Sequence, residues 1–224
     1  MTNPEISINR GVGWPNDLWE QAAPIVERAE RRACEGIDYL ELEFTIPKRG
    51  SIRRYASEDK IDFAGLSWAG QHFVVNTTMA RNGRLHFVSR TADWSTISVH
   101  ELVHTIRMEH FQYAGRLEKV AAEGLAYKGE HLFASEFWPN QKVIRLNDYS
   151  WRRNPALDRS FWEAYNSNSM SQWNAWFYAD TKFDISRGAL LGLQRVHWQM
   201  RLGRAYQELL TLPPEEVLGW AGRL

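Results

Sequence analysis

The chain carries the pentapeptide His100-Glu101-Leu102-Val103-His104, an HExxH pattern. In an α-helix, two residues four positions apart lie about 40° apart around the axis and one turn along it. The imidazoles of His100 and His104 can therefore reach one metal ion from the same helix face. Neutral imidazole suits zinc, and a catalytic zinc site keeps one position open for water beside three protein ligands. Glu101 is then placed to act as general base toward that water.

The residues around this pentapeptide predict a helix. No glycine or proline interrupts residues 95–111, and Asp93 or Ser95 is expected to cap the helix at its N-terminus. Apolar side chains recur at the spacing of a buried helix face, at Val99, Leu102, Val103 and Ile106. A helical context makes metal binding a stronger interpretation than a chance occurrence of the pattern.

Composition and charge favour a soluble globular protein. The chain has 224 residues, 44% of them hydrophobic and 24% charged, with a formal net charge of zero. Such a balance gives no long-range attraction to nucleic acid or to an anionic membrane. The single cysteine, Cys34, permits no intrachain disulfide and is expected to be a small buried apolar residue. Residues 1–10 lack the apolar core of a signal peptide and no 18-residue apolar run follows, so we expect a cytoplasmic protein without a membrane span.

The residues before the HExxH stretch predict one helix and a small sheet. The expected helix covers 17–35 and is ended by Gly36. Alternating apolar and polar residues predict a first strand, which Pro47 ends, and later apolar runs predict two more on either side of an Asn82-Gly83 turn. The expected strands cover 38–46, 72–77 and 85–89, with a polar loop at 48–60. His72 and His86 fall within these strands and are interpreted as structural.

The residues after the HExxH stretch predict helices alone. They are expected at 117–133, 160–165, 172–177 and 186–210, with Pro213 opening a last short helix. The predicted fold class is therefore α+β. We expect a single domain over residues 1–224, in which a sheet lobe with the HExxH helix covers about 1–115 and a helical lobe covers 116–224.

Two residues compete for the place of the third metal ligand. His110 follows His104 by six residues, which is the spacing of the metzincin motif HExxHxxGxxH. The glycine of that motif, which turns the chain back toward the metal, is Arg107 here. If the helix continues through Arg107, His110 lies about 120° around the axis from His104 and about 9 Å further along it. The predicted role of His110 is then that of a cation at the helix C-terminus.

Glu123 is the rival and the preferred ligand. It follows His104 by nineteen residues, on the next expected helix, so that a loop and a returning helix can bring its carboxylate back to the site. The resulting HExxH-x18-E pattern is the gluzincin arrangement, and two histidines with one glutamate form an established catalytic zinc site. Gly124 beside it allows close approach of another helix. The alternative is that Glu123 is an exposed helix charge.

With these motifs, the chain resembles a largely uncharacterised bacterial family of predicted zinc-dependent proteases of gluzincin type, distantly similar to thermolysin. The resemblance is carried by Val99-His-Glu-Leu-Val-His104 and Ala122-Glu-Gly-Leu-Ala126. Gly188-Ala-Leu-Leu-Gly192-Leu-Gln-Arg-Val196 also matches the glycines and the valine of a later family motif. The resemblance covers roughly residues 70–217. It implies a zincin-like fold in which an edge strand lies beside the cleft and can pair with extended peptide.

The chain departs from this family at two positions. The tyrosine of the later motif is Ala189. If that tyrosine stabilises the oxyanion in relatives, this chain either needs another donor, with Tyr178 and His197 as the candidates, or is slower. The acid that orients a ligand histidine in thermolysin-like enzymes lies four residues after the glutamate ligand. That position is Tyr127 here, so this supporting contact is not carried over.

The predicted function is zinc-dependent hydrolysis of an amide, namely a metallopeptidase acting on a peptide or protein. One Zn²⁺ per chain is held by His100, His104 and Glu123, and Glu101 is the catalytic base. Two alternatives remain at this point. One is a zinc-binding regulatory or interaction protein with weak or no activity, which Ala189 and Tyr127 favour. The other is a zinc hydrolase of a non-peptide substrate.

Overall fold

The computed structural model describes residues 5–55, 65–68, 70–78, 91–111, 115–140, 155–167, 169–178 and 186–221. In these residues the chain is mixed α+β and mostly helical, with one four-stranded sheet. It divides into two compact units, Met1–His110 with Gly129–Ile144, and Phe111–Lys128 with Arg145–Leu224. The boundary falls inside one continuous helix, α3 (Arg116–Phe137).

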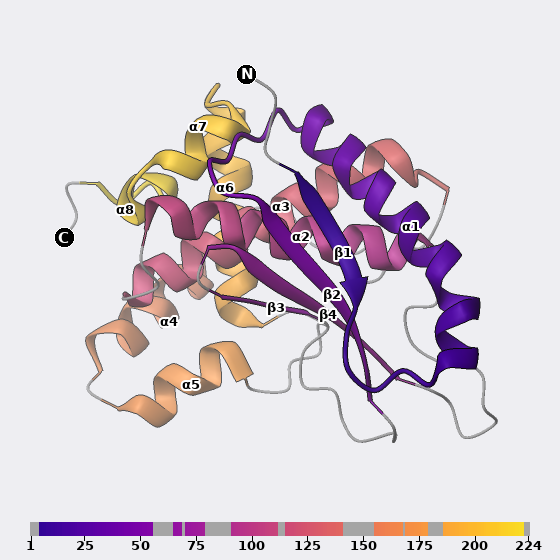
Figure 1. Cartoon of the computed structure of the whole chain (residues 1–224). Helices are drawn as coiled ribbons and strands as arrows, with labels where there is room; N and C mark the ends of the chain where they lie inside the picture. The colour runs from indigo at the N-terminus through magenta and orange to yellow at the C-terminus, as the bar shows by residue number, and fades with distance from the viewer. Residues whose placement is uncertain are drawn as a thin grey trace. The chain divides into compact units, whose positions relative to one another are not determined.

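The first unit contains the sheet, whose strands lie in the order β1-β2-β4-β3 (Figure 1). Strands β1 and β2 are parallel, as are β2 and β4, whereas β3 runs antiparallel to β4. The strands are β1 (Ile6–Arg10), β2 (Lys48–Tyr55), β3 (Gly65–Trp68) and β4 (His72–Thr78). Strand β3 is therefore an edge strand of the sheet as described.

One face of this sheet is buried. Residues paired across neighbouring strands point to the same face, so the pairing shows which side chains lie there. Ile8 pairs with Gly50, which in turn pairs with Phe73, and a Cβ atom at Gly50 would lie only 2.3 Å from the Phe73 ring. The next row across the sheet contains Ile52 and Val75, both fully buried. Glycine at position 50 thus makes room for the Phe73 side chain on the buried face.

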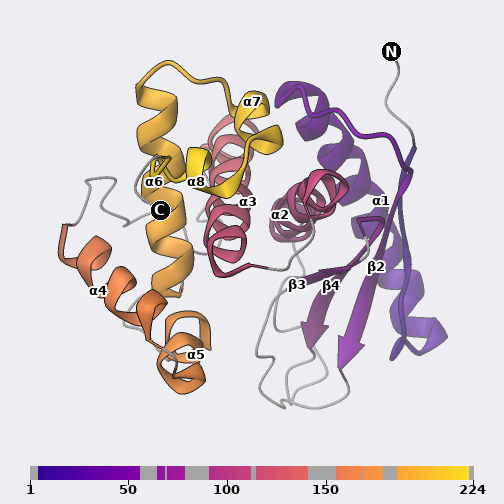
Figure 2. The same ribbon diagram turned by 90° about the vertical axis from the view of Figure 1, so that its left-hand side faces the viewer.

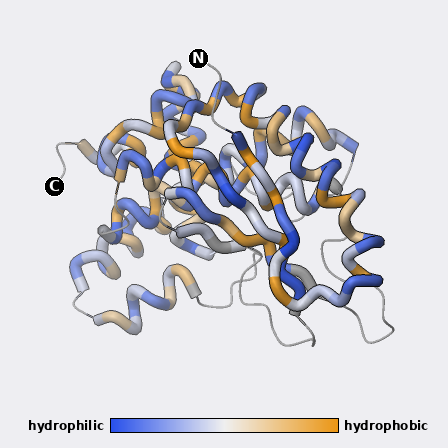
Figure 3. The backbone as a smooth tube through the Cα atoms, in the orientation of Figure 1, coloured by the Kyte–Doolittle hydropathy of each residue, from blue (hydrophilic) through white to orange (hydrophobic). Residues whose placement is uncertain are grey.

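Two long helices, α1 (Asn16–Tyr39) and α2 (Thr91–His110), pack on each other and on the sheet (Figure 2). Helix α1 contacts β1, and α2 contacts β3 and β4. Hydrophobic and hydrophilic residues alternate in bands along α1 (Figure 3), as expected for a helix with one buried side. The buried side is formed by Ala22, Val26, Ala29, Ala33 and Ile37.

The second unit is helical where it is described. It contains α4 (Pro155–Asn166), α5 (Met170–Tyr178), α6 (Arg187–Arg201), α7 (Tyr206–Thr211) and α8 (Pro214–Val217), besides the first part of α3. Aromatic rings fill its interior: Phe161 stacks on Trp220 with 5.0 Å between ring centroids, and Trp176 meets Phe161 edge-on. Several of the eleven tryptophans are therefore packing residues.

Helices α3 and α6 approach closely within this second unit. A Cβ atom at Gly124 would lie 2.2 Å from the backbone of Gly192, so neither helix tolerates a side chain at the crossing. The Tyr206 hydroxyl donates to the carbonyl of Leu125 at 2.7 Å and joins α7 to α3. The prediction that Gly124 allows close helix approach is confirmed.

Several predicted elements agree with the structure. The strand expected at 72–77 is β4, the HExxH helix is α2, and the helix expected at 117–133 is α3, which is longer at both ends. The last short helix after Pro213 is α8. None of the helices in the described part of the chain is both long and apolar enough to cross a membrane. The Asn82-Gly83 turn and the strand at 85–89, with His86, lie outside the described residues.

The predictions for residues 36–60 were partly wrong. Gly36 lies inside α1, which continues to Tyr39, and does not end the helix. A Cβ at this position would meet the Phe133 ring at 2.5 Å, so the glycine allows close packing there. No strand forms over residues 38–46. Leu40, Leu42 and Phe44 are alternately buried, so the alternation of apolar residues reflects packing without a strand ladder.

The prediction of a loop at 48–60 was also wrong over residues 48–55, which form β2. This strand is rich in charged residues, and it points the Lys48 side chain into the buried face, where an ion pair compensates the charge. Burial of a lysine hides the period-2 pattern that marks a strand. The short strands β1 and β3 were not predicted.

Two predictions about helix boundaries and one about the burial of Cys34 needed correction. Helix α2 starts at Thr91, so Asp93 and Ser95 lie inside its first turns and neither is the N-cap. The long helix expected at 186–210 is broken between α6 and α7, where Gly203 has a φ of +95° that other residues rarely adopt. Cys34 is half-buried on α1 rather than fully buried, and burial raises its pKa to about 11, with Glu30 contributing.

Candidate metal centre

Helix α2 places His100 and His104 on one side, with their Nε2 atoms 3.2 Å apart. The ring centroids are 4.9 Å apart and the ring planes are inclined by 72°. Two nitrogen atoms bound to one tetrahedral zinc ion at about 2.0–2.1 Å lie roughly 3.3 Å apart. The spacing of the two Nε2 atoms therefore fits two ligands of a single zinc ion.

The outer nitrogen of His100 is held by a carboxylate. Its Nδ1 atom lies 2.9 Å from Oε2 of Glu130, on α3, and both side chains are nearly buried. A carboxylate can only accept a hydrogen bond, so in the neutral ring Nδ1 carries the hydrogen and Nε2 keeps its lone pair. Sequence reasoning missed Glu130. The available signal was its position seven residues after Glu123, which puts the two glutamates on the same face of a helix.

His104 is buried, with 5% of its surface exposed. Burial, and secondly the neighbouring His100, lower the pKa of His104 well below its ordinary value. The imidazole is therefore neutral at neutral pH, which is the form that binds a metal ion.

Glu123 completes a possible set of three ligands. It lies on α3, two turns before Glu130, and α3 is continuous between them. His100, His104 and Glu123 can each offer one ligand atom, and these atoms all lie within 4.8 Å of one another. Two imidazoles and one carboxylate match the donor set of catalytic zinc sites.

Glu101 lies about 100° around α2 from His100 and about 60° from His104, and its carboxylate lies against the edge strand β3. A Cβ atom at Gly65 would lie 2.4 Å from Oε1 of Glu101, and Glu101 is 5% exposed. The register explains this contact, because Gly65 pairs with Val75 and so belongs to the sheet face that α2 covers. Only a residue without a side chain leaves room for the carboxylate at this point of β3.

His110 is not brought to the histidine pair by the helix. Helix α2 continues through Arg107, whose side chain is fully buried, and ends at His110, which is exposed. Along a continuous helix, His110 lies about 120° around the axis and about 9 Å along it from His104. The chain turn that a third histidine ligand would need is therefore absent from α2.

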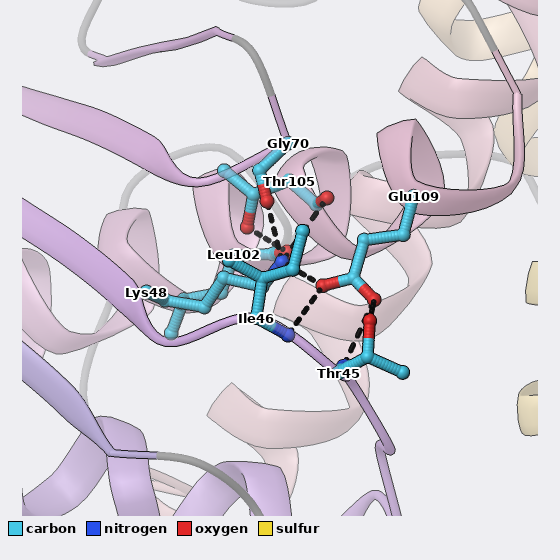
Figure 4. Close-up of polar contacts among 7 residues, drawn as sticks. All are labelled: Thr45, Ile46, Lys48, Gly70, Leu102, Thr105 and Glu109. Carbon is cyan, nitrogen blue, oxygen red and sulfur yellow. Dashed lines mark hydrogen bonds and ion pairs between the residues drawn. The ribbon is translucent and has the colours of Figure 1, made fainter.

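The C-terminal end of α2 is fixed by a buried ion pair between Lys48 of β2 and Glu109 (Figure 4). Nζ of Lys48 also donates to the carbonyls of Gly70, at 2.5 Å, and Thr105, at 3.4 Å. Glu109 in turn accepts hydrogen bonds from the backbone amide of Thr45, at 2.9 Å, and from its hydroxyl, at 2.7 Å. These contacts attach α2 to the chain around the start of β2.

The charges of this pair influence each other. Burial raises the pKa of Glu109, but the hydrogen bonds from Lys48 and Thr45 outweigh it and hold the pKa below its ordinary value. Burial lowers the pKa of Lys48, and Glu109 opposes this effect. Each charge thus offsets the cost of burying the other, and the ion pair fixes the position of the helix that carries the two histidines.

The candidates for an oxyanion donor are only partly described. The side chain of Tyr178 lies outside the described residues. His197, on α6, has its Nδ1 atom 3.4 Å from Nζ of Lys128. Burial lowers the pKa of His197, and Lys128 and Arg201 lower it further, so the ring is neutral at neutral pH.

Comparison of the chain with models of protein families, with curated proteins and with solved structures gave no match. The function is therefore inferred from the geometry of the residues themselves, because a fold alone does not determine a function.

Proposed function

We propose that the chain is a zinc-dependent hydrolase of gluzincin type with a zincin-like fold, and specifically a metallopeptidase. The observation that carries the proposal is the 3.2 Å separation of the Nε2 atoms of His100 and His104. It fits tetrahedral zinc, and Glu123 lies within reach as the third ligand. In this assignment the protein holds one zinc ion per chain through these three residues.

The donor set supports zinc over calcium and magnesium. Two neutral imidazoles and one carboxylate suit zinc, whereas calcium and magnesium sites consist of oxygen ligands. Three protein ligands also leave the fourth tetrahedral position for water or substrate, which is the property that separates catalytic from structural zinc sites.

Glu101 is proposed to move the proton during hydrolysis. Zinc, when bound, lowers the pKa of a coordinated water and polarises the substrate carbonyl. The Glu101 carboxylate accepts a proton from the attacking water and passes it to the amine that leaves. A purely structural zinc site has no use for this carboxylate, so the presence of Glu101 supports a catalytic role.

A peptide is the substrate that the neighbouring strand supports best. In the described part of the sheet, β3 pairs with β4 alone, and a peptide substrate is proposed to add to its other side. Extended peptides commonly add to such an edge through main-chain hydrogen bonds. Because Gly65 of β3 lies against Glu101, a peptide on this edge would run beside the proposed base.

The test is cleavage of a mixed peptide library by the purified full chain. The protein is stripped with a chelator and then assayed with and without one equivalent of zinc, and new peptide termini are detected by mass spectrometry. We expect new termini only in the zinc-loaded sample. A sample that retains zinc but produces none contradicts the peptidase assignment and favours the zinc-binding regulatory protein, or a zinc hydrolase of other substrates.

A further inference from the structure

We infer that Glu130 is a positioning residue that orients His100 toward the proposed zinc ion. This inference rests on the proposed function. Its basis is the contact between Oε2 of Glu130 and Nδ1 of His100, at 2.9 Å, within a single unit of the chain. The side chains are 6% and 12% exposed, so water competes little for either group.

The contact determines which nitrogen of His100 carries the hydrogen. A carboxylate accepts hydrogen bonds and donates none, so the hydrogen of the neutral ring must lie on Nδ1. Nε2 then has its lone pair available, and this is the atom that lies 3.2 Å from Nε2 of His104. Without an acceptor at Nδ1, the ring can place its hydrogen on Nε2 instead, and in that form Nε2 cannot bind a metal ion.

The contact also determines the orientation of the ring. A hydrogen bond at Nδ1 limits rotation of the imidazole about its side-chain bonds, which lowers the entropic cost of placing Nε2 at a metal ion. His100 needs this support, because it is the more exposed of the two histidines. His104 is held by its buried surroundings.

The position of Glu130 on α3 is consistent with this role. Seven residues separate it from Glu123, so the two side chains lie about 20° apart around the helix and about 10.5 Å apart along it. One face of α3 can thus support His100 through Glu130 and supply the proposed ligand Glu123.

The first experiment reads the hydrogen position directly, without metal. The full chain, labelled with ¹⁵N at histidine, is stripped of metal and studied by NMR at neutral pH, and the His100 signals are assigned by their loss in His100→Gln. We expect the wild type to show the Nδ1–H form of His100. Glu130→Leu, which removes the acceptor, is expected to shift His100 toward the Nε2–H form.

The second experiment measures zinc affinity by competition with a chelator. Loss of a carboxylate that supports a ligand histidine typically lowers metal affinity about 10–100-fold. We expect a loss in this range for Glu130→Leu and a smaller one for Glu130→Gln, whose amide oxygen can still accept the hydrogen bond. Glu136→Leu removes an exposed glutamate from the same helix and serves as the matched control, with affinity unchanged.

The results separate this inference from the proposed function. If the wild type binds no zinc, the proposed function fails. If the wild type binds zinc tightly and Glu130→Leu binds it equally well, Glu130 is not a positioning residue, although the proposed function stands. A merely structural role for Glu130 predicts unchanged His100 signals in Glu130→Gln and Glu130→Leu, and that result would overturn the inference even if Glu130→Leu were less stable.

Discussion

The Glu101 carboxylate lies against Gly65 of the edge strand β3, where a Cβ atom would approach Oε1 to 2.4 Å. This contact joins the proposed base to the strand on which a peptide substrate is expected to lie. The two histidines point elsewhere on α2, toward each other and toward Glu130. Glu101 lies about 60° around α2 from His104, so a change in β3 can displace its carboxylate while the contacts of the two histidines with each other and with Glu130 are kept.

The Gly65→Ala variant tests the contact with Glu101. The added methyl group must displace the Glu101 side chain, because its Oε1, Cγ and Cδ atoms lie 2.4, 2.6 and 2.7 Å from the position of the new Cβ. We expect zinc content to stay as in the wild type while kcat falls on the order of 100-fold, because the proton acceptor is misplaced. Gly115→Ala is the control, since a Cβ there meets no atom within 4 Å. Equal activity of Gly65→Ala and wild type would show that the position of Glu101 does not matter.

Replacement of Glu101 by glutamine tests the role of the base itself. The amide cannot accept the proton of the attacking water, so turnover should fall roughly 100- to 10,000-fold while zinc content is retained. Peptide cleavage and bound zinc are measured on the same preparations. Activity close to that of the wild type would assign the base to another residue.

The third ligand is tested by two single substitutions. Glu123→Ala should lose stoichiometric zinc, because it removes a proposed ligand and its charge. His110→Ala should retain zinc, because α2 continues through Arg107 and carries His110 away from the pair. Zinc content is measured by atomic spectroscopy after removal of excess metal. The reverse pattern, with loss only in His110→Ala, would favour the metzincin arrangement and remove the basis of the family resemblance.

The ion pair at the end of α2 makes a prediction about stability. Glu109→Gln leaves Lys48 buried without its counter-ion and should lower the free energy of unfolding by about 3 kcal/mol at neutral pH. The folded-state pKa of Glu109 is below its ordinary value, so its stabilising effect is present above about pH 4.5 and is lost as the pH falls through the folded pKa. The difference in stability between wild type and Glu109→Gln should therefore shrink at low pH. Denaturant unfolding at several pH values measures it, and a difference that is constant or grows below pH 4 would contradict the assigned role.

The helices were largely predictable from the sequence, whereas most of the sheet was not. The apolar face of α2 and the uninterrupted run after Ser95 predict its helix, and β4 follows from its run of apolar residues. Strand β2 was missed because it buries Lys48, whose charge is compensated by Glu109, 61 residues away. Sequence patterns do not reveal such a distant partner. The opposite error was to predict a strand over residues 38–46. Alternate side chains are buried there, at Leu40, Leu42 and Phe44, but these described residues form no strand.

The same distinction applies to the candidate metal centre. His100, Glu101 and His104 were identified because their spacing is local and follows from helix geometry. Glu130 was missed because the supporting acid was expected at position 127, which is a tyrosine. The hydrogen bond between Glu130 and His100 depends on how two helices pack, and single-sequence patterns do not specify that packing.

The central claim is that His100 and His104 hold one zinc ion, and zinc stoichiometry tests it most directly. The wild type and the double variant His100→Ala, His104→Ala are stripped with a chelator, supplied with excess zinc, freed of unbound metal and analysed for zinc per chain. We predict about one zinc ion per chain in the wild type and none in the double variant, because loss of two ligands leaves too few to hold the metal. A wild type without zinc, or a double variant that retains one ion per chain, would contradict the account.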